Sequence, residues 1–245
     1  MRSAPTNRKT ADPADSTGAL PFRGGRTLAV CDFDGTVCTV DMGNAILNRF
    51  SRTKWEEIDR AYCAREIGSL TAYRMLTPIL RGSRKGMADF VRKNARLDPE
   101  FPAFVRFCRE LGVDVMILSD GLDFYIETFL EQFDLQGIDY YANRLSFGKE
   151  DALDIDFPYS SECGSCGTCK SGILLRSRAE YDTVVYIGDG FSDICPAREA
   201  DCVFAKGVLY EACLRNGTAC IRYEHFGDVI DALQAAWTLR EARRS

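Results

Sequence analysis

The chain has a single histidine, His225, among its 245 residues. A serine-hydrolase triad needs a histidine base, and an HExxH zinc site needs two histidines on one helix. The sequence therefore disfavours both classes, and we expect His225 to be structural. Positive charge is also in short supply, since 31 lysines and arginines stand against 36 acidic residues and give a net charge of −5. Nucleic-acid binders usually present a basic face, so we expect no nucleic-acid partner.

Long apolar runs are missing as well. No run is long enough to span a bilayer, so we expect no membrane association. Residues 1–25 lack the apolar core of a signal peptide and are polar, with several prolines and glycines, which predicts a disordered N-terminal tail. Eleven cysteines without a signal peptide favour a reducing compartment over a disulfide scaffold, and we expect a cytoplasmic protein.

What the chain does have is apolar runs of strand length, each followed by polar residues. The runs at 28–31, 113–118 and 184–187 lead into Asp-Phe-Asp-Gly-Thr at 32–36, Ser-Asp-Gly at 119–121 and Gly-Asp-Gly-Phe-Ser-Asp at 188–193. Such runs are typical of buried parallel strands, and open α/β sheets bind ligands at the carboxyl ends of their strands. We expect these segments, together with Lys170, to form one site.

The first of these segments fits phosphoryl transfer. Asp32 can attack phosphorus and carry an aspartyl-phosphate. Asp34 can protonate the leaving alkoxide and then deprotonate the hydrolytic water. Gly35 lets the chain bend, and Thr36 can hydrogen-bond a neighbouring carboxylate or a phosphoryl oxygen. Clustered carboxylates repel one another unless a cation joins them, and Mg²⁺ suits such an all-oxygen site.

The other segments supply groups that bind phosphate. Ser119 and the amides around Asp120 and Gly121 are expected at a strand-to-helix turn, where they offer donors to phosphate oxygens. Lys170 supplies a point charge for the phosphoryl oxygens and the nucleophile. Each piece alone is typical of a turn, a helix N-terminus or a surface lysine. Because all of them occur in order after predicted strands, the catalytic interpretation is favoured.

At these residues the chain resembles the haloacid dehalogenase superfamily of Mg²⁺-dependent phosphatases, over about residues 26–225. The resemblance implies a Rossmann-like α/β core with a parallel sheet. It also implies Asp32 as nucleophile and metal ligand, Asp34 as acid/base and backbone metal ligand, and Asp189 as the third metal ligand. Asp193 would be a supporting carboxylate near the metal or Lys170.

A helical insertion is predicted between the first two strands, which are separated by about 80 residues. Apolar residues recur at helical spacing over 42–50, 54–67, 70–80 and 87–95. Further helices are expected from 98 to 111 and over 122–133, and the aromatic residues of the latter should lie in the core. We therefore predict a small helical cap at 41–97 and a catalytic core formed by 26–40 and 98–245.

An early helical cap resembles the phosphoserine-phosphatase-like branch, whose members act on small metabolites. In that branch a carboxylate at about the place of Asp41 holds the substrate amino group, whereas a helix N-cap is the alternative reading of Asp41. The matching cap arginine is not found, because Arg74 and Arg81 are both off the pattern. We therefore expect a small phosphomonoester as substrate, with phosphoserine kept as an alternative rather than as the assigned substrate.

The segment 156–170 narrows the comparison. With its cysteines it resembles the loop before the motif lysine in the methionine-salvage phosphatases that hydrolyse 2-hydroxy-3-oxo-5-methylthiopentenyl 1-phosphate. A related loop, and the residues at 188–196, also resemble the phosphoethanolamine/phosphocholine phosphatases. A phosphomutase and a non-catalytic phosphate-binding regulatory module are the alternatives from other classes.

Three cysteines in this loop, Cys163, Cys166 and Cys169, leave several possibilities open. They are free or structural thiols, ligands of a metal, or a redox switch. Zinc would need a fourth ligand such as Cys195, and the spacing lacks the fourth cysteine that an iron–sulfur cluster prefers. The oligomeric state is not determined by the sequence.

Overall fold

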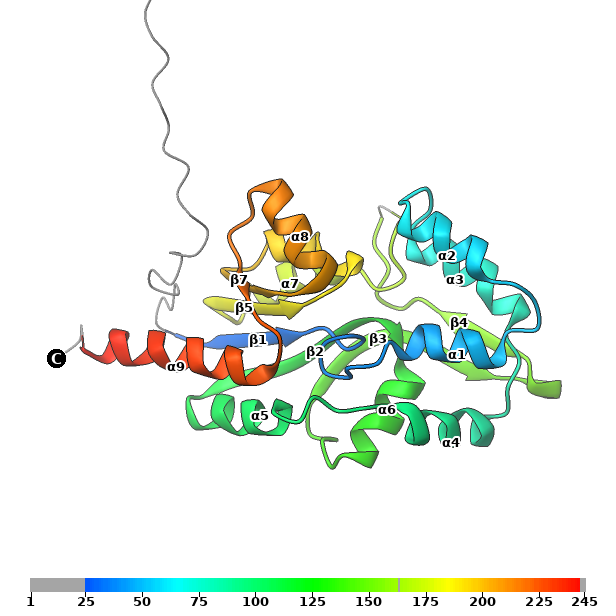
Figure 1. Cartoon of the computed structure of the whole chain (residues 1–245), viewed down its shortest axis with the longest axis horizontal. Coiled ribbons are helices and arrows are strands. Elements are labelled where there is room, and N and C mark those ends of the chain that lie inside the picture. Colours follow the sequence, from blue (N-terminus) through cyan, green and yellow to red (C-terminus); the bar gives the residue numbers. More distant parts are fainter. Residues whose placement is uncertain (1–24, 163, 243–245) are drawn as a thin grey trace, which may run out of the picture.

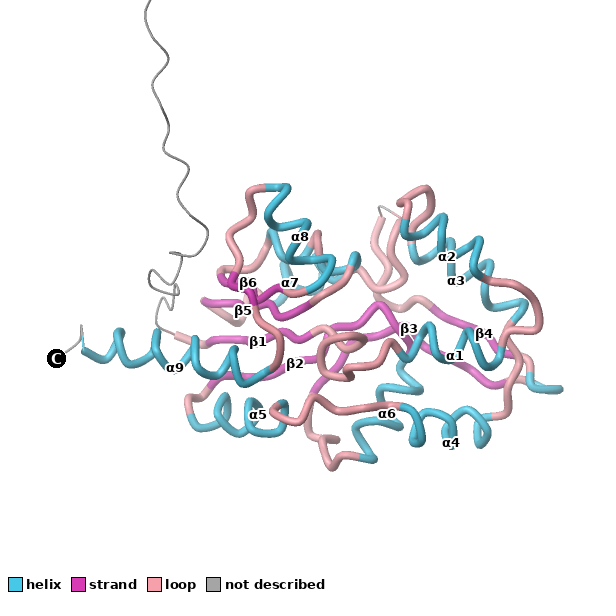
Figure 2. The backbone as a smooth tube through the Cα atoms, in the orientation of Figure 1, coloured by secondary structure: helices cyan, strands magenta, loops and turns pink. Residues whose placement is uncertain are grey.

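The computed structural model describes residues 25–162 and 164–242. Seven strands form one sheet in the order β4-β3-β2-β1-β5-β6-β7, and every neighbouring pair is parallel except β3 and β4. Figure 2 shows the strands in magenta, with helices to either side. The strands are β1 (Thr27–Cys31), β2 (Val113–Leu122), β3 (Asp139–Phe147), β4 (Leu153–Asp156), β5 (Thr183–Gly188), β6 (Cys202–Ala205) and β7 (Ile221–Arg222). The predicted α/β fold, with its mostly parallel core sheet and a helical insertion after the first strand, is confirmed.

The helices are α1 (Met42–Phe50), α2 (Glu56–Cys63), α3 (Ser69–Leu76), α4 (Arg84–Asn94), α5 (Phe101–Glu110), α6 (Asp123–Gln132), α7 (Lys170–Ser177), α8 (Gly207–Asn216) and α9 (Phe226–Ala242). Short 3₁₀ turns are η2 (Thr77–Ile79), η3 (Lys149–Asp151), η4 (Phe191–Asp193) and η5 (Pro196–Arg198). None of the helices in the described ranges is long and apolar enough to cross a membrane.

Strand β1 lies at the centre of the sheet and is buried along its whole length. Because side chains alternate between the faces of a strand, Leu28 and Val30 pack with α7 and α8, whereas Ala29 and Cys31 pack with helices of the other face. Figure 1 shows α4, α5, α6 and α9 on this second face. The chain leaves β1 for β2 on one side and returns to β5 on the other, so a topological switch point lies at the end of β1.

The helices of the insertion fall into two groups, according to whether they pack against the sheet. Met42 and Ile46 of α1, and Met87 and Val91 of α4, belong to the same buried cluster as the sheet. By contrast, α2 has no buried residue and packs beside α3, beyond the carboxyl ends of β1 and β5 (Figure 1). The domain boundaries at residues 41 and 97 stay a prediction, and the tail expected at 1–25 lies, except for Gly25, outside the described residues.

One local prediction is wrong. Ser119, Asp120 and Gly121 were expected at a strand-to-helix turn, but β2 continues to Leu122 and α6 begins only at Asp123. Leu118 pairs with Tyr141 and Leu122 with Asn143, so three residues of β2 lie opposite one residue of β3. This bulge keeps the segment extended, since Asn143 Nδ2 donates to the Asp120 carbonyl oxygen at 2.7 Å.

Candidate active site

The structure brings the sequence-predicted residues together at the carboxyl ends of β1, β2 and β5. A cavity of about 430 Å³ is lined by seven of them: Asp32, Asp34, Asp41, Ser119, Asp120, Gly121 and Asp189. The remaining three, Thr36, Lys170 and Asp193, are buried. Thr36 and Lys170 donate hydrogen bonds to carboxylates of the group, and Asp193 accepts one from Lys170. A larger cavity, about 670 Å³, lies at the amino ends of β1 and β2, beside Arg26 and Asp114. None of the predicted site residues lines it.

Asp32 follows β1 and has its two carboxylate oxygens in different surroundings. Oδ1 accepts hydrogen bonds from Lys170 Nζ at 2.6 Å and from the Phe33 amide at 2.7 Å. Among residues 25–162 and 164–242, none donates a hydrogen bond to Oδ2. Burial, aided by the charge of Asp193, raises the pKa of Asp32 well above its usual range, although Lys170 acts in the opposite direction. One oxygen is thus anchored and the other is left for chemistry.

Asp193 is saturated with donors. Oδ2 accepts from the amides of Asp189 and Gly190, both at 2.9 Å, and Oδ1 accepts from Lys170 at 2.7 Å and from the Tyr186 hydroxyl at 2.6 Å. Burial raises the pKa of Asp193, but the Lys170 ammonium and these hydrogen bonds outweigh it, so the pKa lies below its usual value. Asp193 therefore holds Lys170 against Asp32. Tyr186 was not predicted as part of the site.

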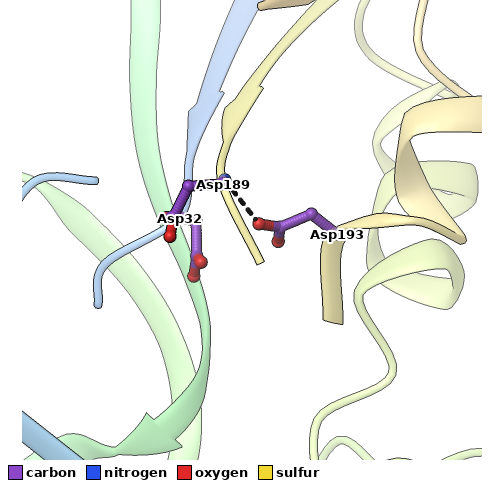
Figure 3. A group of neighbouring side chains, drawn as sticks. All are labelled: Asp32, Asp189 and Asp193. Atoms are coloured by element: carbon purple, nitrogen blue, oxygen red, sulfur yellow. Dashed lines mark hydrogen bonds between the residues drawn. The ribbon is translucent and has the colours of Figure 1, made fainter. Parts of the chain in front are cut away.

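Three carboxylates, those of Asp32, Asp189 and Asp193, form an acidic cluster beside Lys170. Figure 3 shows Asp32 and Asp189 side by side with Asp193 facing them, and one carboxylate oxygen of each lies within 4.8 Å of the others. Burial, together with the charge of Asp193, raises the pKa of Asp189 to about 6. Carboxylate oxygens are the donors that hard divalent cations prefer, so the residues present fit a metal ion. Sequence and structure agree on the donor chemistry but do not name the metal.

Asp34 has a partner that the sequence did not reveal. The Tyr125 hydroxyl donates to Asp34 Oδ2 at 2.5 Å, and the Met42 amide donates to Oδ1 at 2.7 Å. Burial, with the nearby charge of Asp41, raises the pKa of Asp34 to about 7. Tyr125 is a residue of α6 and is buried in the core of the protein, as expected for the aromatic residues of this helix. A signal was available, because a buried tyrosine, unlike phenylalanine, needs a hydrogen-bond partner.

A close approach at Gly35 brings the end of β1 to Asp189. Thr36 Oγ1 donates to Asp189 Oδ1 at 2.6 Å and lies 3.3 Å from the Tyr223 hydroxyl. Gly35 has a φ of +81°, and a Cβ atom there would lie 2.3 Å from Asp189 Oδ2. The glycine is therefore required for both its backbone conformation and its lack of a side chain. Thr36 contacts a neighbouring carboxylate, one of the two partners expected for it.

Ser119 and Asp120 differ in how their side chains are engaged. Ser119 Oγ accepts from the Gly121 amide at 2.9 Å, which leaves its hydroxyl proton for another acceptor. Asp120 Oδ1 already accepts from the Thr168 amide at 2.8 Å and from Asn143 Nδ2 at 3.3 Å. Ser119 is thus available to a ligand, whereas Asp120 is engaged with the protein.

Asp41 is the N-cap of α1. It accepts from the Asn44 amide at 2.8 Å and from Asn44 Nδ2 at 2.7 Å, so the helix-cap reading is confirmed, and the same side chain also lines the cavity. Neither Arg74 nor Arg81 lines it, and among the described residues its wall includes no lysine or arginine. Cys163 lies outside the described residues, so the three alternatives for the loop cysteines, namely thiols, metal ligands and a redox switch, are not tested.

Comparison with known proteins decides the family. Residues 27–210 match the sequence pattern of a family described as "Putative Phosphatase". The chain belongs to this family. Its fold and motifs make it a phosphatase of the haloacid dehalogenase type, a phosphoric monoester hydrolase.

The chain matches curated relatives over nearly the whole length of those relatives. The 2-hydroxy-3-keto-5-methylthiopentenyl-1-phosphate phosphatase of Brevibacillus brevis is 32% identical over 85% of this chain and 96% of the relative. The protein of the same name from Geobacillus kaustophilus is 33% identical over 83% of this chain and 94% of its own.

Solved structures support the fold. A phospho-aspartyl intermediate analogue of phosphoserine phosphatase matches with a TM-score of 0.67 at 20% identity, over 85% of this chain and 99% of that one. A probable phosphoserine phosphatase from Vibrio cholerae matches with a TM-score of 0.68 at 20% identity, over 89% of this chain and 67% of that one. At this identity the likeness concerns the fold of the phosphatase and not its substrate.

Proposed function

We propose that this phosphatase hydrolyses a small phosphomonoester through an aspartyl-phosphate on Asp32, and that its substrate is most like that of the methionine-salvage relatives. The observation that carries the substrate assignment is their identity of 32–33% over more than four fifths of the chain. The contacts around Asp32 support the mechanism, because Lys170 and the Phe33 amide fix one oxygen of the nucleophile and leave the other for attack.

The chain supplies each step of this mechanism. Asp32 attacks phosphorus, while Ser119 and Lys170 stabilise the phosphoryl oxygens. Asp34 protonates the leaving oxygen and then removes a proton from the hydrolytic water. Burial, with the charge of Asp41, raises the pKa of Asp34 to about 7 against the opposing effect of the Tyr125 hydrogen bond, so Asp34 can both give and take a proton near neutrality.

We assign the metal to Asp32, Asp189 and the backbone carbonyl of Asp34, with Mg²⁺ as the ion. Bound there, the ion neutralises charge on the carboxylates and on the transferring phosphoryl group. Asp193 is proposed as a supporting residue that orients Lys170, because its oxygens already accept four hydrogen bonds at 2.6–2.9 Å.

The cavity favours a leaving group without a second negative charge. Its wall carries apolar side chains, among them Ile46, Leu47, Ile58 and Leu76, and the carboxylates of Asp41 and Asp59. A substrate carboxylate, as in phosphoserine, would meet these acids without a cationic partner from the described wall. A neutral chain with a thioether end suits the apolar part.

A second candidate is a phosphocholine or phosphoethanolamine phosphatase. It is favoured by the acids Asp41 and Asp59 and by the rings of Tyr62 and Tyr73, because carboxylates and aromatic faces attract a cationic head. For Asp41, binding of a substrate amino group remains part of this proposal. Cytoplasmic location stays a prediction.

Phosphate release from a panel of esters tests the proposal. The panel contains the methionine-salvage ester, phosphoserine, phosphocholine, phosphoethanolamine, sugar phosphates and pyridoxal phosphate, each with Mg²⁺ or EDTA and with Asp32→Asn as control. We expect Mg²⁺-dependent release from the methionine-salvage ester and no release by the variant. Preference for phosphocholine would favour the second candidate, and preference for phosphoserine would contradict the reading of the cavity. Activity only in the presence of a sugar bisphosphate would indicate a phosphomutase. A folded protein inactive on every ester would favour a binding module.

A further inference from the structure

A buried hydrogen-bond network joins four segments that lie far apart in the sequence. Its centre is Asn143 of β3, which is fully buried. Asn143 Nδ2 donates to the carbonyl oxygen of Asp120 at 2.7 Å and to its Oδ1 at 3.3 Å. Asn143 Oδ1 accepts from Thr168 Oγ1 at 3.1 Å, and the Thr168 amide donates to Asp120 Oδ1 at 2.8 Å. The two side chains thus fix the end of the cysteine-bearing loop onto the sheet.

The first turn of α3 joins the same network. The Gly167 amide donates to Ser69 Oγ at 3.1 Å. The Leu70 amide donates to the Ser165 carbonyl oxygen at 3.1 Å. Helix α3 is therefore attached to the loop by two of its first residues, Ser69 and Leu70.

Two glycines make these contacts possible. A Cβ atom on Gly68 would lie 2.0 Å from the Ser165 carbonyl oxygen, and one on Gly167 would lie 2.6 Å from Asn143 Oδ1. Both obstacles are close and one is backbone, so a side chain at either position would force the segments apart. The start of α3 and the loop thus approach each other, and the loop approaches β3, at positions where no side chain intervenes.

The network lies between the cavity wall and Lys170. Helix α3 lines the cavity with Ser69, Ala72, Tyr73 and Leu76. The loop that it touches leads directly into Lys170, the first residue of α7, two positions after Thr168. Helix α3 is therefore hydrogen-bonded to the segment that directly precedes Lys170 and determines where its backbone lies.

We propose that Asp120 is a positioning residue that couples the placement of α3 over the cavity to the placement of Lys170 beside Asp32. This rests on the proposed phosphatase function. It differs from a role for Asp120 as a phosphate ligand, because a carboxylate repels a phosphoryl group and the side chain of Asp120 already accepts hydrogen bonds from Asn143 and Thr168. The cysteine-bearing loop is then the link through which α3 acts.

Kinetics of Asp120→Asn and Ser69→Ala test the proposal, with p-nitrophenyl phosphate and Mg²⁺ as the probe. Asp120→Asn keeps the shape of the side chain but directs an amide towards donors, and Ser69→Ala removes the hydroxyl that joins α3 to the network. We expect kcat to fall about 10- to 100-fold in both variants, as for small misplacements of catalytic groups, with little change in KM. Thr71→Ala, an exposed change on the same helix, should leave both constants unaltered. Leu233→Ala, which removes a buried side chain of α9, shows how far lost stability alone changes kcat and KM.

Amide hydrogen exchange gives a readout that does not depend on activity. Ser69→Ala should speed exchange at residues 165–170 as well as at the start of α3, whereas Thr71→Ala should not. A raised KM with unchanged kcat in Asp120→Asn would overturn the proposal in favour of a ligand role. Unchanged exchange at 165–170 in Ser69→Ala would refute the coupling. If the unaltered protein proves inactive on every ester, the proposed function fails while the exchange experiment still decides the coupling.

Discussion

At the scale of single residues, hydrogen-bond donors distinguish carboxylates that look alike in the sequence. Asp193 accepts hydrogen bonds on both oxygens from backbone amides, a lysine and a tyrosine, whereas within the described part of the chain Asp32 accepts hydrogen bonds only on Oδ1. An anchored carboxylate with one available oxygen suits a nucleophile, and a saturated one suits an orienting role. The two proposed roles follow from this difference.

Replacing the proposed nucleophile is the first residue-scale prediction. Asp32→Asn keeps the shape of the side chain but removes its charge, so we expect turnover to fall more than about 100-fold while the protein stays folded. Phosphate release and circular dichroism measure the two effects. Asp89→Asn, an exposed carboxylate on α4, is the matched control. Residual turnover above a few per cent would remove Asp32 from this role.

The hydroxyl of Tyr125 provides the second residue-scale prediction. Tyr125→Phe deletes the donor to Asp34 at 2.5 Å. A hydrogen bond to a charged group contributes about 1.5–3 kcal/mol, so we expect kcat to fall about 10- to 100-fold. Tyr140→Phe loses a bond of the same length to Glu127, at the surface, and should retain full activity. Equal activity in both variants would show that Tyr125 only fills the core.

At the scale of elements, turns at strand ends decide where side chains meet. The sequence predicted the strand β1 and the polar turn after it, because an apolar run and a glycine are local signals. It did not predict the bulge in β2, since this depends on Asn143 of the neighbouring strand, which holds the Asp120 carbonyl. Helix α6 consequently begins one residue later than expected, at Asp123.

Two glycines with positive φ give an element-scale prediction. Gly35 has a φ of +81° and no room for a Cβ beside Asp189, whereas Gly217, at the end of α8, has a φ of +67° and open space. Alanine costs about 1–2 kcal/mol of unfolding free energy at either position because of the left-handed backbone. We expect Gly35→Ala also to lose activity, because Asp189 must move, and Gly217→Ala to keep it.

Denaturant unfolding and phosphate release on the two alanine variants separate these effects. Full activity of Gly35→Ala would show that Asp189 tolerates displacement, and an inactive Gly217→Ala would show that backbone strain alone explains the loss.

At the scale of the whole molecule, helices from both sides of the sheet and the insertion after β1 enclose one acidic cavity. The donors come from the turns that follow β1 and β5, so a metal ion bound there would stabilise the folded state as a whole. The lining also includes residues of α1, α2 and α3, which the sequence placed in a helical cap without showing which of them face the cavity.

Metal binding is the prediction at this scale. Mg²⁺ at 100 times its Kd should stabilise the protein by about 2.7 kcal/mol, which thermal unfolding detects as a raised Tm. Asp189→Asn should abolish this rise, and EDTA should abolish phosphate release. Asp228→Asn, outside the cavity, is the matched control. A rise of Tm that persists in Asp189→Asn would contradict the proposed ligand set.

The sequence by itself determined the apolar runs that form β1, β2 and β5, the helical insertion, and the placement of Asp32 and Asp189 directly after β1 and β5. These follow from local signals, namely apolar runs and the turn residues that end them. Only the tertiary structure decided which carboxylate meets which donor, because the partners are distant: Tyr125 lies 91 residues from Asp34, and Thr168 lies 48 from Asp120. Residues so far apart meet through the packing of strands and helices, which no local pattern encodes.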